Sequence, residues 1–307
     1  MALFQNHAGF NLFGSKLQLV EVNYKTKNFC LENIDEEYFS EFLDLSIKET
    51  KFISVLQNAF DEIILRKPLN TNYVSFSLPH EFFRIAEIPY DATLIGEDLI
   101  DHLKWEISLL YPDYEARDYI VQYIDTKSGD NGTAKQAIVI AAIKKYLKII
   151  HKFCVRNNLI LKFIDNSHIA SNSVIWLDNP ASNNDYYVNI MLGRLNLSVI
   201  LLKDNLPVYF KIKHLQSAAD VIPKLLYEMG NLKDKKITLN SVKKVYISGD
   251  HISDNIIHRL EKALNISLIK YNPFNYIEAN PALHENEFYT DKFNSFTSAA
   301  GIALRLI

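Results

Sequence analysis

Two segments of the chain, residues 9–22 and residues 187–202, share one arrangement of an apolar stretch, a tight turn and a second apolar stretch. They begin about 180 residues apart. When the two turns are aligned, Leu17 falls on Leu197, and the alternation of apolar and polar residues is in phase. Alternation with a period of two on both sides of a turn is typical of a β-hairpin. The repeat therefore predicts a chain of two related halves, each with a hairpin near its start.

The composition is that of an ordinary globular protein large enough for two lobes. The chain has 307 residues, 48% of them hydrophobic, and a formal net charge of −3, so it can fill substantial cores but gives no support for nucleic-acid binding. Cys30 and Cys154 lie far apart without CxxC spacing, which argues against a zinc site. No apolar run reaches the roughly 20 residues that cross a bilayer, and the N-terminus lacks signal-peptide features. We therefore expect a cytoplasmic protein, which leaves open peripheral attachment to a membrane through a partner.

Hydrophobic periodicity predicts the elements that surround the two hairpins. In the first half we expect a strand from residue 28, helices over 35–47 and 51–66, a strand over 73–78, a helix over 146–157, a strand over 160–164 and a helix from Ser167. In the second half we expect strands over 187–192, 195–202, 208–213, 243–248 and 266–270, and helices over 217–229, from Ser253 as N-cap, and over 293–306. Gly230 is expected to end the first of these helices.

The stretch from residue 81 to residue 143 has a different character. It is predicted to hold an aromatic strand over 82–88, a helix over 94–110, and two strands over 119–124 and 136–143. We read it as a subdomain inserted into the first lobe. The predicted fold class is α/β, with two lobes and an inserted subdomain: residues 1–80 and 146–180 form the first lobe core, 81–145 the insert, and 181–307 the second lobe.

Short landmarks along the chain resemble, in order, those of a known superfamily. They are Gly9–Leu12 with Lys16–Glu21, Phe76–Pro79 with Ile88-Pro89, Trp105-Glu106 with Tyr111-Pro112, Phe163–Asp165, Val245–Gly249, Asn272–Phe274 and Ala299–Arg305. The series resembles the actin-like ATPase superfamily, whose fold is ribonuclease H-like. Within it, the chain resembles the PilM proteins of type IV pilus assembly, relatives of the cell-division protein FtsA. The similarity covers nearly the whole chain.

This resemblance implies both a fold and a partner. It implies a scaffold at the inner-membrane platform of a pilus or related secretion machine, bound to the N-terminal cytoplasmic tail of a PilN-like bitopic membrane protein. Self-association is open, and no nucleic acid is expected. The tail is expected in a groove that involves the insert, and aromatic side chains are enriched at the centres of interfaces. Five aromatic residues of the insert are therefore candidates for partner contact, the alternative being core packing: Phe82, Phe83, Tyr90, Trp105 and Tyr111.

The same resemblance places a nucleotide site on the two hairpins. In the family, the first hairpin carries an Asp, a Gly, small hydroxyl residues and then a Lys; the matching positions here are Asn11, Phe13, Gly14, Ser15 and Gln18. The family's second Asp-x-Gly corresponds to Met191-Leu-Gly193, and the Gly-Gly of its adenosine loop to Gly249-Asp250. We interpret Asn11, Gly14, Ser15, Gly193, Gly249 and Asp250 as a vestigial nucleotide site.

The replacements remove what a magnesium nucleotide requires. Mg²⁺ is held by carboxylates, phosphates and ordered water, so an amide at Asn11 and a thioether at Met191 remove anionic ligands from both hairpins. Loss of a residue that orients the metal or the attacking water costs on the order of 10² to 10⁴ in rate. Phe13 places a benzyl group where the fold uses glycine. The sequence therefore predicts no catalytic residue, no metal site and no ATP or Mg²⁺ cofactor.

Three alternatives stay open at this point. One is an active Mg-ATP-dependent ATPase or sugar-kinase-like enzyme of the same fold, whose metal would be held by unusual residues. Another is an FtsA-like division protein, although such proteins usually end in a linker and an amphipathic membrane helix, whereas this chain stops inside the predicted final helix. A GspL-like secretion component would carry a membrane span, and no apolar run of this sequence is long enough for one. The third is an acid/base group formed by Asp250 and His251 near Asp254, which a loop before a capped helix explains equally well. The histidines show no metal-binding spacing.

Overall fold

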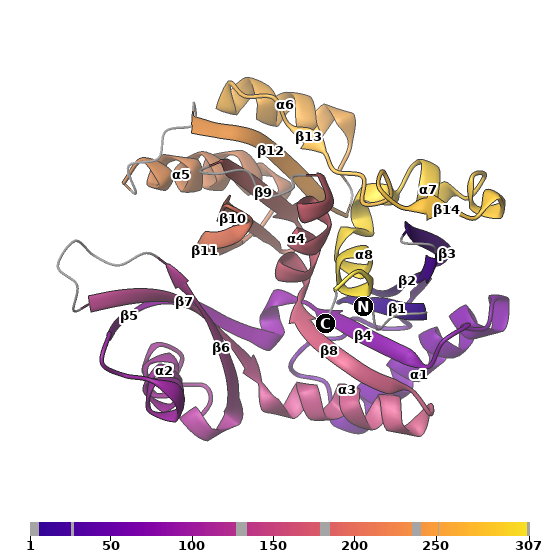
Figure 1. Ribbon diagram of the computed structural model, residues 1–307, viewed down its shortest axis with the longest axis horizontal. Helices are drawn as coiled ribbons and strands as arrows, with labels where there is room; N and C mark the ends of the chain where they lie inside the picture. The colour runs from indigo at the N-terminus through magenta and orange to yellow at the C-terminus, as the bar shows by residue number, and fades with distance from the viewer. Residues whose placement is uncertain are drawn as a thin grey trace. The chain divides into compact units, whose positions relative to one another are not determined.

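The computed structural model describes residues 6–25, 28–126, 134–178, 185–234, 241–250 and 252–305 (Figure 1). The chain divides into two compact units, each built from separate stretches of sequence. Unit 1 comprises Met1–Phe82, Lys145–Pro180 and Tyr271–Ile307, and unit 2 comprises Phe83–Lys144 and Ala181–Lys270. No helix of the described part of the chain is both long and apolar enough to span a bilayer.

Unit 1 is built on a six-stranded sheet with the order β14-β3-β2-β1-β4-β8. Its strands are β1 (Asn6–Phe13), β2 (Lys16–Lys25), β3 (Asn28–Tyr38), β4 (Tyr73–Leu78), β8 (Ile160–Asn166) and β14 (Glu278–Ala279). β1 and β2 form the predicted first hairpin, with Phe13 paired to Lys16 across the turn, while β4 joins β1 in parallel. The predicted hairpin is thus confirmed, and it lies in the middle of the sheet.

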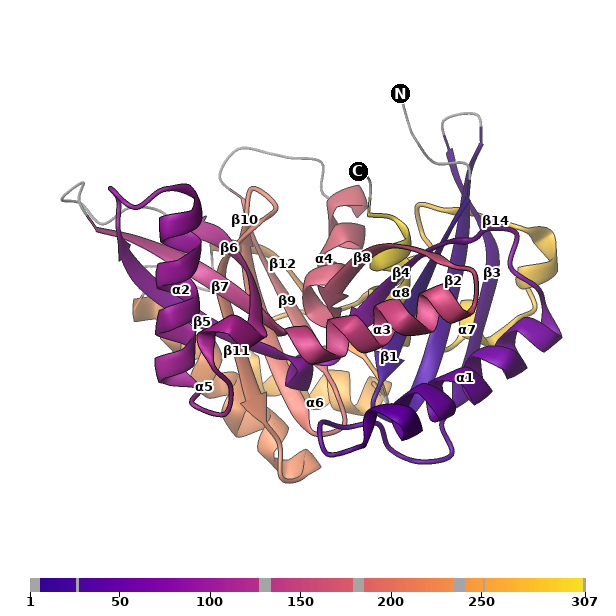
Figure 2. The ribbon, with the colours of Figure 1, turned by 90° about the horizontal axis from the view of Figure 1, so that it is seen from below.

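Helices cover both faces of this sheet. They are α1 (Glu49–Arg66), α3 (Lys144–Arg156), α4 (Ser167–Asp178), α7 (Glu287–Thr290) and α8 (Thr297–Ala303). α1 and α3 cover one face (Figure 2). On this face the ring centroids of Phe10 of β1 and Phe60 of α1 lie 5.8 Å apart, and those of Phe76 of β4 and Phe153 of α3 lie 6.0 Å apart. α8 covers the other face with small residues, and a Cβ on Gly9 would overlap the carbonyl oxygen of Ala299. The backbone of α8 therefore lies close against this face of the sheet.

Unit 2 contains two sheets. The five-stranded sheet has the order β11-β10-β9-β12-β13, with β9 (Tyr186–Leu192), β10 (Asn196–Lys203), β11 (Leu206–His214), β12 (Val242–Gly249) and β13 (Ile269–Lys270). β9 and β10 form the predicted second hairpin. The insert forms the sheet β5-β7-β6, with β5 (Phe83–Asp91), β6 (Tyr119–Thr126) and β7 (Ala134–Ile143), and carries α2 (Gly96–Leu110). Short 3-10 turns lie at His80–Phe82, Ala116–Asp118, Ala218–Asp220, Pro281–Leu283 and Phe293–Ser295.

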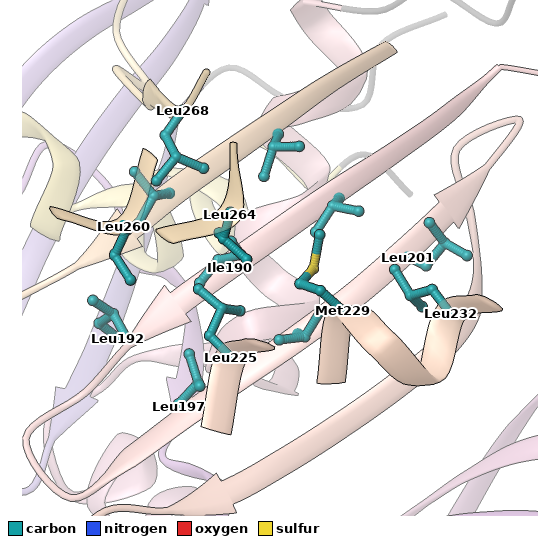
Figure 3. Packing of buried hydrophobic residues seen from close by; sticks show 14 of the residues in the cluster. Ile190, Leu192, Leu197, Leu201, Leu225, Met229, Leu232, Leu260, Leu264 and Leu268 are labelled. Atoms are coloured by element: carbon teal, nitrogen blue, oxygen red, sulfur yellow. The ribbon is translucent and has the colours of Figure 1, made fainter. Parts of the chain in front are cut away.

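The hydrophobic core of unit 2 lies between the five-stranded sheet and two helices, α5 (Val221–Asp234) and α6 (Asp254–Leu264). Figure 3 shows Ile190 and Leu192 of β9 near Leu225 of α5. α6 begins at the predicted N-cap, since the Ser253 side chain accepts a hydrogen bond from the Ile256 N–H at 3.3 Å. This packing fixes the end of β9, and with it the second hairpin turn.

Four expectations about elements need correction. Residues 35–38 belong to β3 and no helix forms over 35–47, because β3 pairs with β2 along its whole length, from Asn28 to Tyr38. Gly230 lies inside α5 and does not end it. The final helix is shorter than predicted, as the 3-10 turn Phe293–Ser295 precedes α8. β13 begins at Ile269 and not at Ile266.

The division into units also differs from the predicted lobes. Residues 271–307 pack within unit 1, because β14 pairs with β3 and α8 lies on β1, β2 and β4. The insert groups with the second hairpin in unit 2, where β5, β6 and β7 contact β11.

Candidate functional site

Asn11 stands at the centre of a buried polar network in unit 1. Its side chain has no exposed surface. The Nδ2 group donates to Gln18 Oε1 at 2.9 Å, and Oδ1 accepts from the hydroxyl of Ser77 at 2.8 Å. The hydroxyl oxygen of Ser167 lies 3.1 Å from the same Oδ1. The side chain at the position where the resemblance implied a metal-orienting carboxylate therefore has its polar atoms engaged within the protein.

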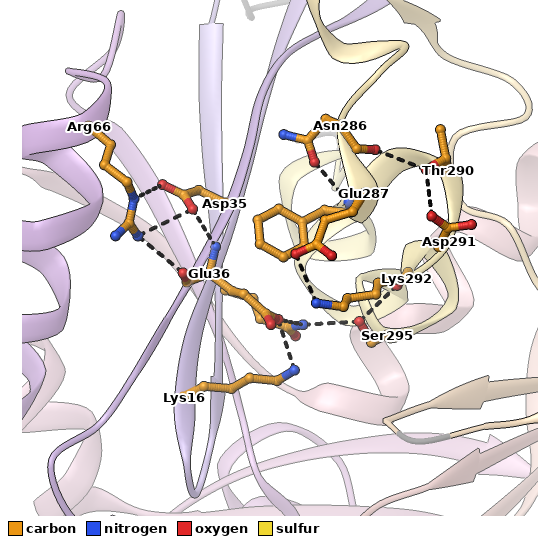
Figure 4. Close-up of polar contacts among 12 residues, drawn as sticks. Lys16, Asp35, Glu36, Arg66, Asn286, Glu287, Thr290, Asp291, Lys292 and Ser295 are labelled. Atoms are coloured by element: carbon orange, nitrogen blue, oxygen red, sulfur yellow. Dashed lines mark hydrogen bonds and ion pairs between the residues drawn. The ribbon is translucent and has the colours of Figure 1, made fainter.

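Gln18 connects this network to a buried ion pair. Its Nε2 donates to Glu36 Oε2 at 3.2 Å and to Ser295 Oγ at 3.3 Å. Lys16 Nζ lies 2.8 Å from Glu36 Oε2 (Figure 4), and both side chains are almost fully buried, 2% and 4% exposed. A buried charge requires a partner of opposite sign, and here the partner of Lys16 is a carboxylate of the same sheet. The positive charge next to the hairpin is thus neutralised internally.

The turn of the first hairpin is covered by the segment after β3. A Cβ on Gly14 would overlap the ring of Phe42, so this ring lies directly against the turn. The carbonyl oxygens of the turn are engaged as well, because Leu43 N donates to Gly14 O at 2.7 Å and Phe39 N to Ser15 O at 2.9 Å. Phe13 itself is only partly buried. The backbone at Gly14 therefore approaches an aromatic ring at the point where the resemblance implied an approach to phosphate.

In unit 2 the structure brings Gly193, Gly249 and Asp250 together around the end of β9. Gly249 pairs with Leu192 in the parallel ladder, and Asp250 N donates to Leu192 O at 3.2 Å. Gly249 has a φ of 127°, and a Cβ there would overlap the same carbonyl, so glycine is required. Gly193 N donates to Asn196 O at 2.9 Å and closes the hairpin. Met191 is buried, 3% exposed.

Comparison with known proteins identifies the fold. No protein-family model matches the sequence. No curated protein matches it either. Among solved structures, the chain superposes with a TM-score of 0.77 and 16% identity on a chain of a PilM–PilN type IV pilus biogenesis complex, covering 97% of this chain and 98% of the other. A protein of unknown function with an actin-like ATPase fold from Bacteroides thetaiotaomicron gives a TM-score of 0.57 at 14% identity, with 98% of each chain covered.

The chain has the actin-like ATPase fold. The resemblance placed the candidate nucleotide-binding residues on the two hairpins of this fold. The geometry of these hairpins decides which ligand they can hold. Mg²⁺ prefers carboxylate oxygens and water. Around position 11 the first hairpin offers a fully engaged amide. The two buried carboxylates in the same row of the sheet already have partners, since Glu36 is bound by Lys16 and Gln18, and Asp165 is paired with Arg305. Within the described ranges no three His, Cys, Asp or Glu side chains cluster in a way that could hold a metal. These residues do not fit a magnesium nucleotide.

The acid/base group suggested by the sequence is only partly covered by the described residues. His251 lies outside them, so the proposed Asp250-His251 group is not described. Elsewhere, His80 is buried beside Asn166, with Nδ1 2.9 Å from the amide nitrogen, and burial lowers its pKa to about 4. It is therefore a neutral core histidine at neutral pH.

The five aromatic candidates for partner contact separate into two groups. Phe82 and Phe83 are 2% and 6% exposed, and the ring of Phe82 lies 4.6 Å from that of Tyr146. Tyr90 is 5% exposed and donates to Asp125 Oδ1 at 2.5 Å, and burial with this bond raises its pKa to about 12. These three side chains pack the interior. Trp105 is 53% exposed, and Tyr111 is partly buried with its hydroxyl donating to Ile85 O at 3.1 Å.

Sequence reasoning missed Glu36 and Phe42. Both lie in the segment that was expected to be helical, so neither was considered near the hairpin. The sequence carries no alternation of apolar and polar residues here, because Asp35, Glu36 and Glu37 are all acidic, and only the pairing of β3 with β2 reveals the strand. A strand extended to residue 38 places Glu36 opposite Gln18.

Proposed function

We propose that this protein is a cytoplasmic, PilM-like scaffold without ATPase activity. In this proposal it binds the N-terminal cytoplasmic tail of a PilN-like membrane protein, and so takes part in the inner-membrane platform of a type IV pilus or related secretion machine. The observation that supports the role is the likeness in fold, along 97% of the chain, to a protein solved as a PilM–PilN complex.

The internal network at the first hairpin supports the absence of hydrolysis. Phosphoryl transfer depends on a metal, on positioned water and on positive charge at the phosphates. In unit 1 the amide of Asn11 is bonded to Gln18 and Ser77, Lys16 is paired with Glu36, and Phe42 lies on Gly14. Each of these groups of the first hairpin already has an internal partner.

The insert offers an apolar surface for the tail. On α2 one face is buried through Leu99, Leu103 and Ile107, while Trp105 and Leu109, one helical turn apart, are 53% and 58% exposed. The ring of His102 lies 6.1 Å from that of Trp105. Exposed aromatic and aliphatic side chains that adjoin one another are typical anchors of protein interfaces. We therefore assign Trp105 and Leu109 as the α2 anchor pair for the tail.

Calorimetry with a synthetic tail tests the proposal. The peptide is the N-terminal cytoplasmic segment of a PilN-like protein from the same genome, chosen by its single membrane helix and its ferredoxin-like domain. We expect binding to the native protein and at least tenfold weaker binding to Trp105→Ala, because interface anchors are worth about 2 kcal/mol or more. The matched control is Leu65→Ala, at an 80% exposed leucine of α1, which leaves the affinity unchanged. A tail that fails to bind the native protein overturns the proposal.

A further inference from the structure

Helix α3 of unit 1 carries a concentration of positive charge that the proposed tail-binding site on α2 does not explain. Residues 134–164 contain no Asp or Glu, although the whole chain has 36 acidic residues in 307 and a net charge of −3. Within this stretch, α3 (Lys144–Arg156) contains four lysines and one arginine. The local charge is therefore opposite in sign to that of the molecule.

The cations of α3 lie on one face. Lys145, Lys148, Lys152 and Arg156 follow one another at spacings of three, four and four residues, which places them along a single stripe about 16 Å long. All four are exposed. The opposite face of α3 is buried in the core of unit 1 through Tyr146, Ile149, Ile150, Phe153 and Cys154. Since packing fixes the helix, the stripe is held outward, and Figure 2 shows α3 lying across the sheet beside α1.

The negative charge near this stripe comes from α1, through Glu49 and through Asp61, whose carboxylate accepts from Gln57, a partner of Asn157 next to Arg156. Lys152 Nζ lies 2.5 Å from Glu49 Oε1 of α1, an exposed pair of small energetic weight. Lys145 lies 5.5 Å from the ring of its neighbour Tyr146. In the part of the chain that the structure describes, Lys148 and Arg156 form no ion pair. The stripe thus keeps most of its charge available to an outside anion.

We propose that the α3 stripe binds the surface of a bilayer that contains anionic phospholipid. Four of the five cations of α3 are lysines, which act as flexible point charges and suit a diffuse array of headgroups, whereas bidentate recognition of a defined phosphate favours arginine. The stripe is a single convex helix face, and no Phe, Tyr or Trp lies among the exposed residues of α3 to stack a base. Val155, 61% exposed, is the apolar residue beside the stripe. Charge complementarity with a flat anionic surface is the arrangement that these features fit.

Vesicle flotation of the purified full chain tests the stripe without the tail peptide. The native protein is expected to float with vesicles of phosphatidylglycerol and phosphatidylethanolamine, and not with vesicles of phosphatidylcholine alone. Raising the salt from about 0.05 M to about 0.5 M is expected to release it, because the attraction is screened over a shorter distance. The double variant K148Q/R156Q is expected to lower the partition coefficient on the order of 30-fold, at ~1 kcal/mol for each cation.

The matched control is R259Q/K262Q, which removes the same two charges from exposed positions on α6 and is expected to float like the native protein. Absence of flotation of the native protein with anionic vesicles overturns the proposal, as does an equal loss in both double variants. Binding to poly-glutamate without binding to vesicles assigns the stripe to an acidic protein segment and also overturns it. Because no tail is present, failure here leaves the tail-binding proposal standing.

Discussion

At the scale of single residues, the chemistry of the first hairpin depends on Asn11 being an amide. An amide can donate to Gln18 and accept from Ser77 at once, whereas a carboxylate can only accept. Glu36 already supplies the carboxylate of this region, and Lys16 neutralises it. A carboxylate at position 11 would have no cation left, since Lys16 is paired with Glu36 and Arg305 with Asp165. The amide at Asn11 and the internal ion pair are therefore two parts of one arrangement.

Asn11→Asp is predicted to destabilise the protein without restoring nucleotide binding. Near pH 7.5 the new carboxylate faces Gln18 Oε1, and we expect the free energy of unfolding to fall on the order of 2 kcal/mol. Burial raises the pKa of such a carboxyl above its unfolded value of about 3.9. The protonated acid can again donate to Gln18, so stability is retained near pH 4 and lost as the pH rises through the folded pKa.

Urea unfolding across this pH range measures the effect, with Asn255→Asp, an exposed position on α6, as the control. In calorimetry with Mg-ATP, neither the native protein nor Asn11→Asp is expected to bind the nucleotide. Neither is expected to hydrolyse it and release phosphate. Micromolar, magnesium-dependent binding by the native protein with turnover would contradict the assignment of this site as vestigial and revive an active ATPase.

At the scale of elements, the sequence predicted those that carry a clear period and missed those that long-range contacts decide. α1 shows its buried stripe in sequence, and the structure gives it from Glu49 to Arg66. Both hairpins were predicted for the same reason. Residues 35–38 were misread, since a run of acidic residues suits an exposed helix, and only pairing with β2 shows that Glu36 faces a buried lysine. The consequence for the site was the omission of Glu36 and Phe42.

Helix α8 provides the prediction at this scale. A Cβ on Gly301 would overlap the carbonyl oxygen of Ala170 in α4, so the two helices meet backbone to backbone. Gly301→Ala is expected to lower the free energy of unfolding by about 1–3 kcal/mol, as added atoms in a closely packed core do. Gly230 lies inside α5 with nothing within 4 Å of a Cβ, and Gly230→Ala is expected to raise stability by about 0.5–1 kcal/mol. Urea unfolding of both variants measures whether each substitution raises or lowers the free energy of unfolding. A stabilised Gly301→Ala would contradict the close packing of α8 on α4.

At the scale of the whole molecule, chain order and spatial order differ. Unit 1 contains the first, middle and last parts of the sequence, because α8 and β14 return to the sheet that β1 starts. The sequence shows the repeat of hairpins but not this return, since β14 and β3 are separated by about 240 residues and carry no matching pattern. The sequence also could not show whether Phe82, Phe83 and Tyr90 are buried or exposed, because aromatic residues of a strand can pack a core or form an interface.

The insert can be removed at its base, and the result separates the two proposed binding surfaces. Phe83 of β5 pairs with Ala142 of β7, so these residues lie about 5 Å apart and a short Gly-Ser linker can replace residues 84–141. Unit 1, with α3, takes no strand from the replaced segment. We expect the variant to lose the tail, because the α2 anchor pair is gone, and to float with anionic vesicles like the full chain. Circular dichroism and urea unfolding report whether unit 2, whose β11 contacts the insert, remains folded. A folded variant that still binds the tail would move the tail site away from α2, whereas a folded variant that no longer floats would remove the assignment of lipid binding to α3.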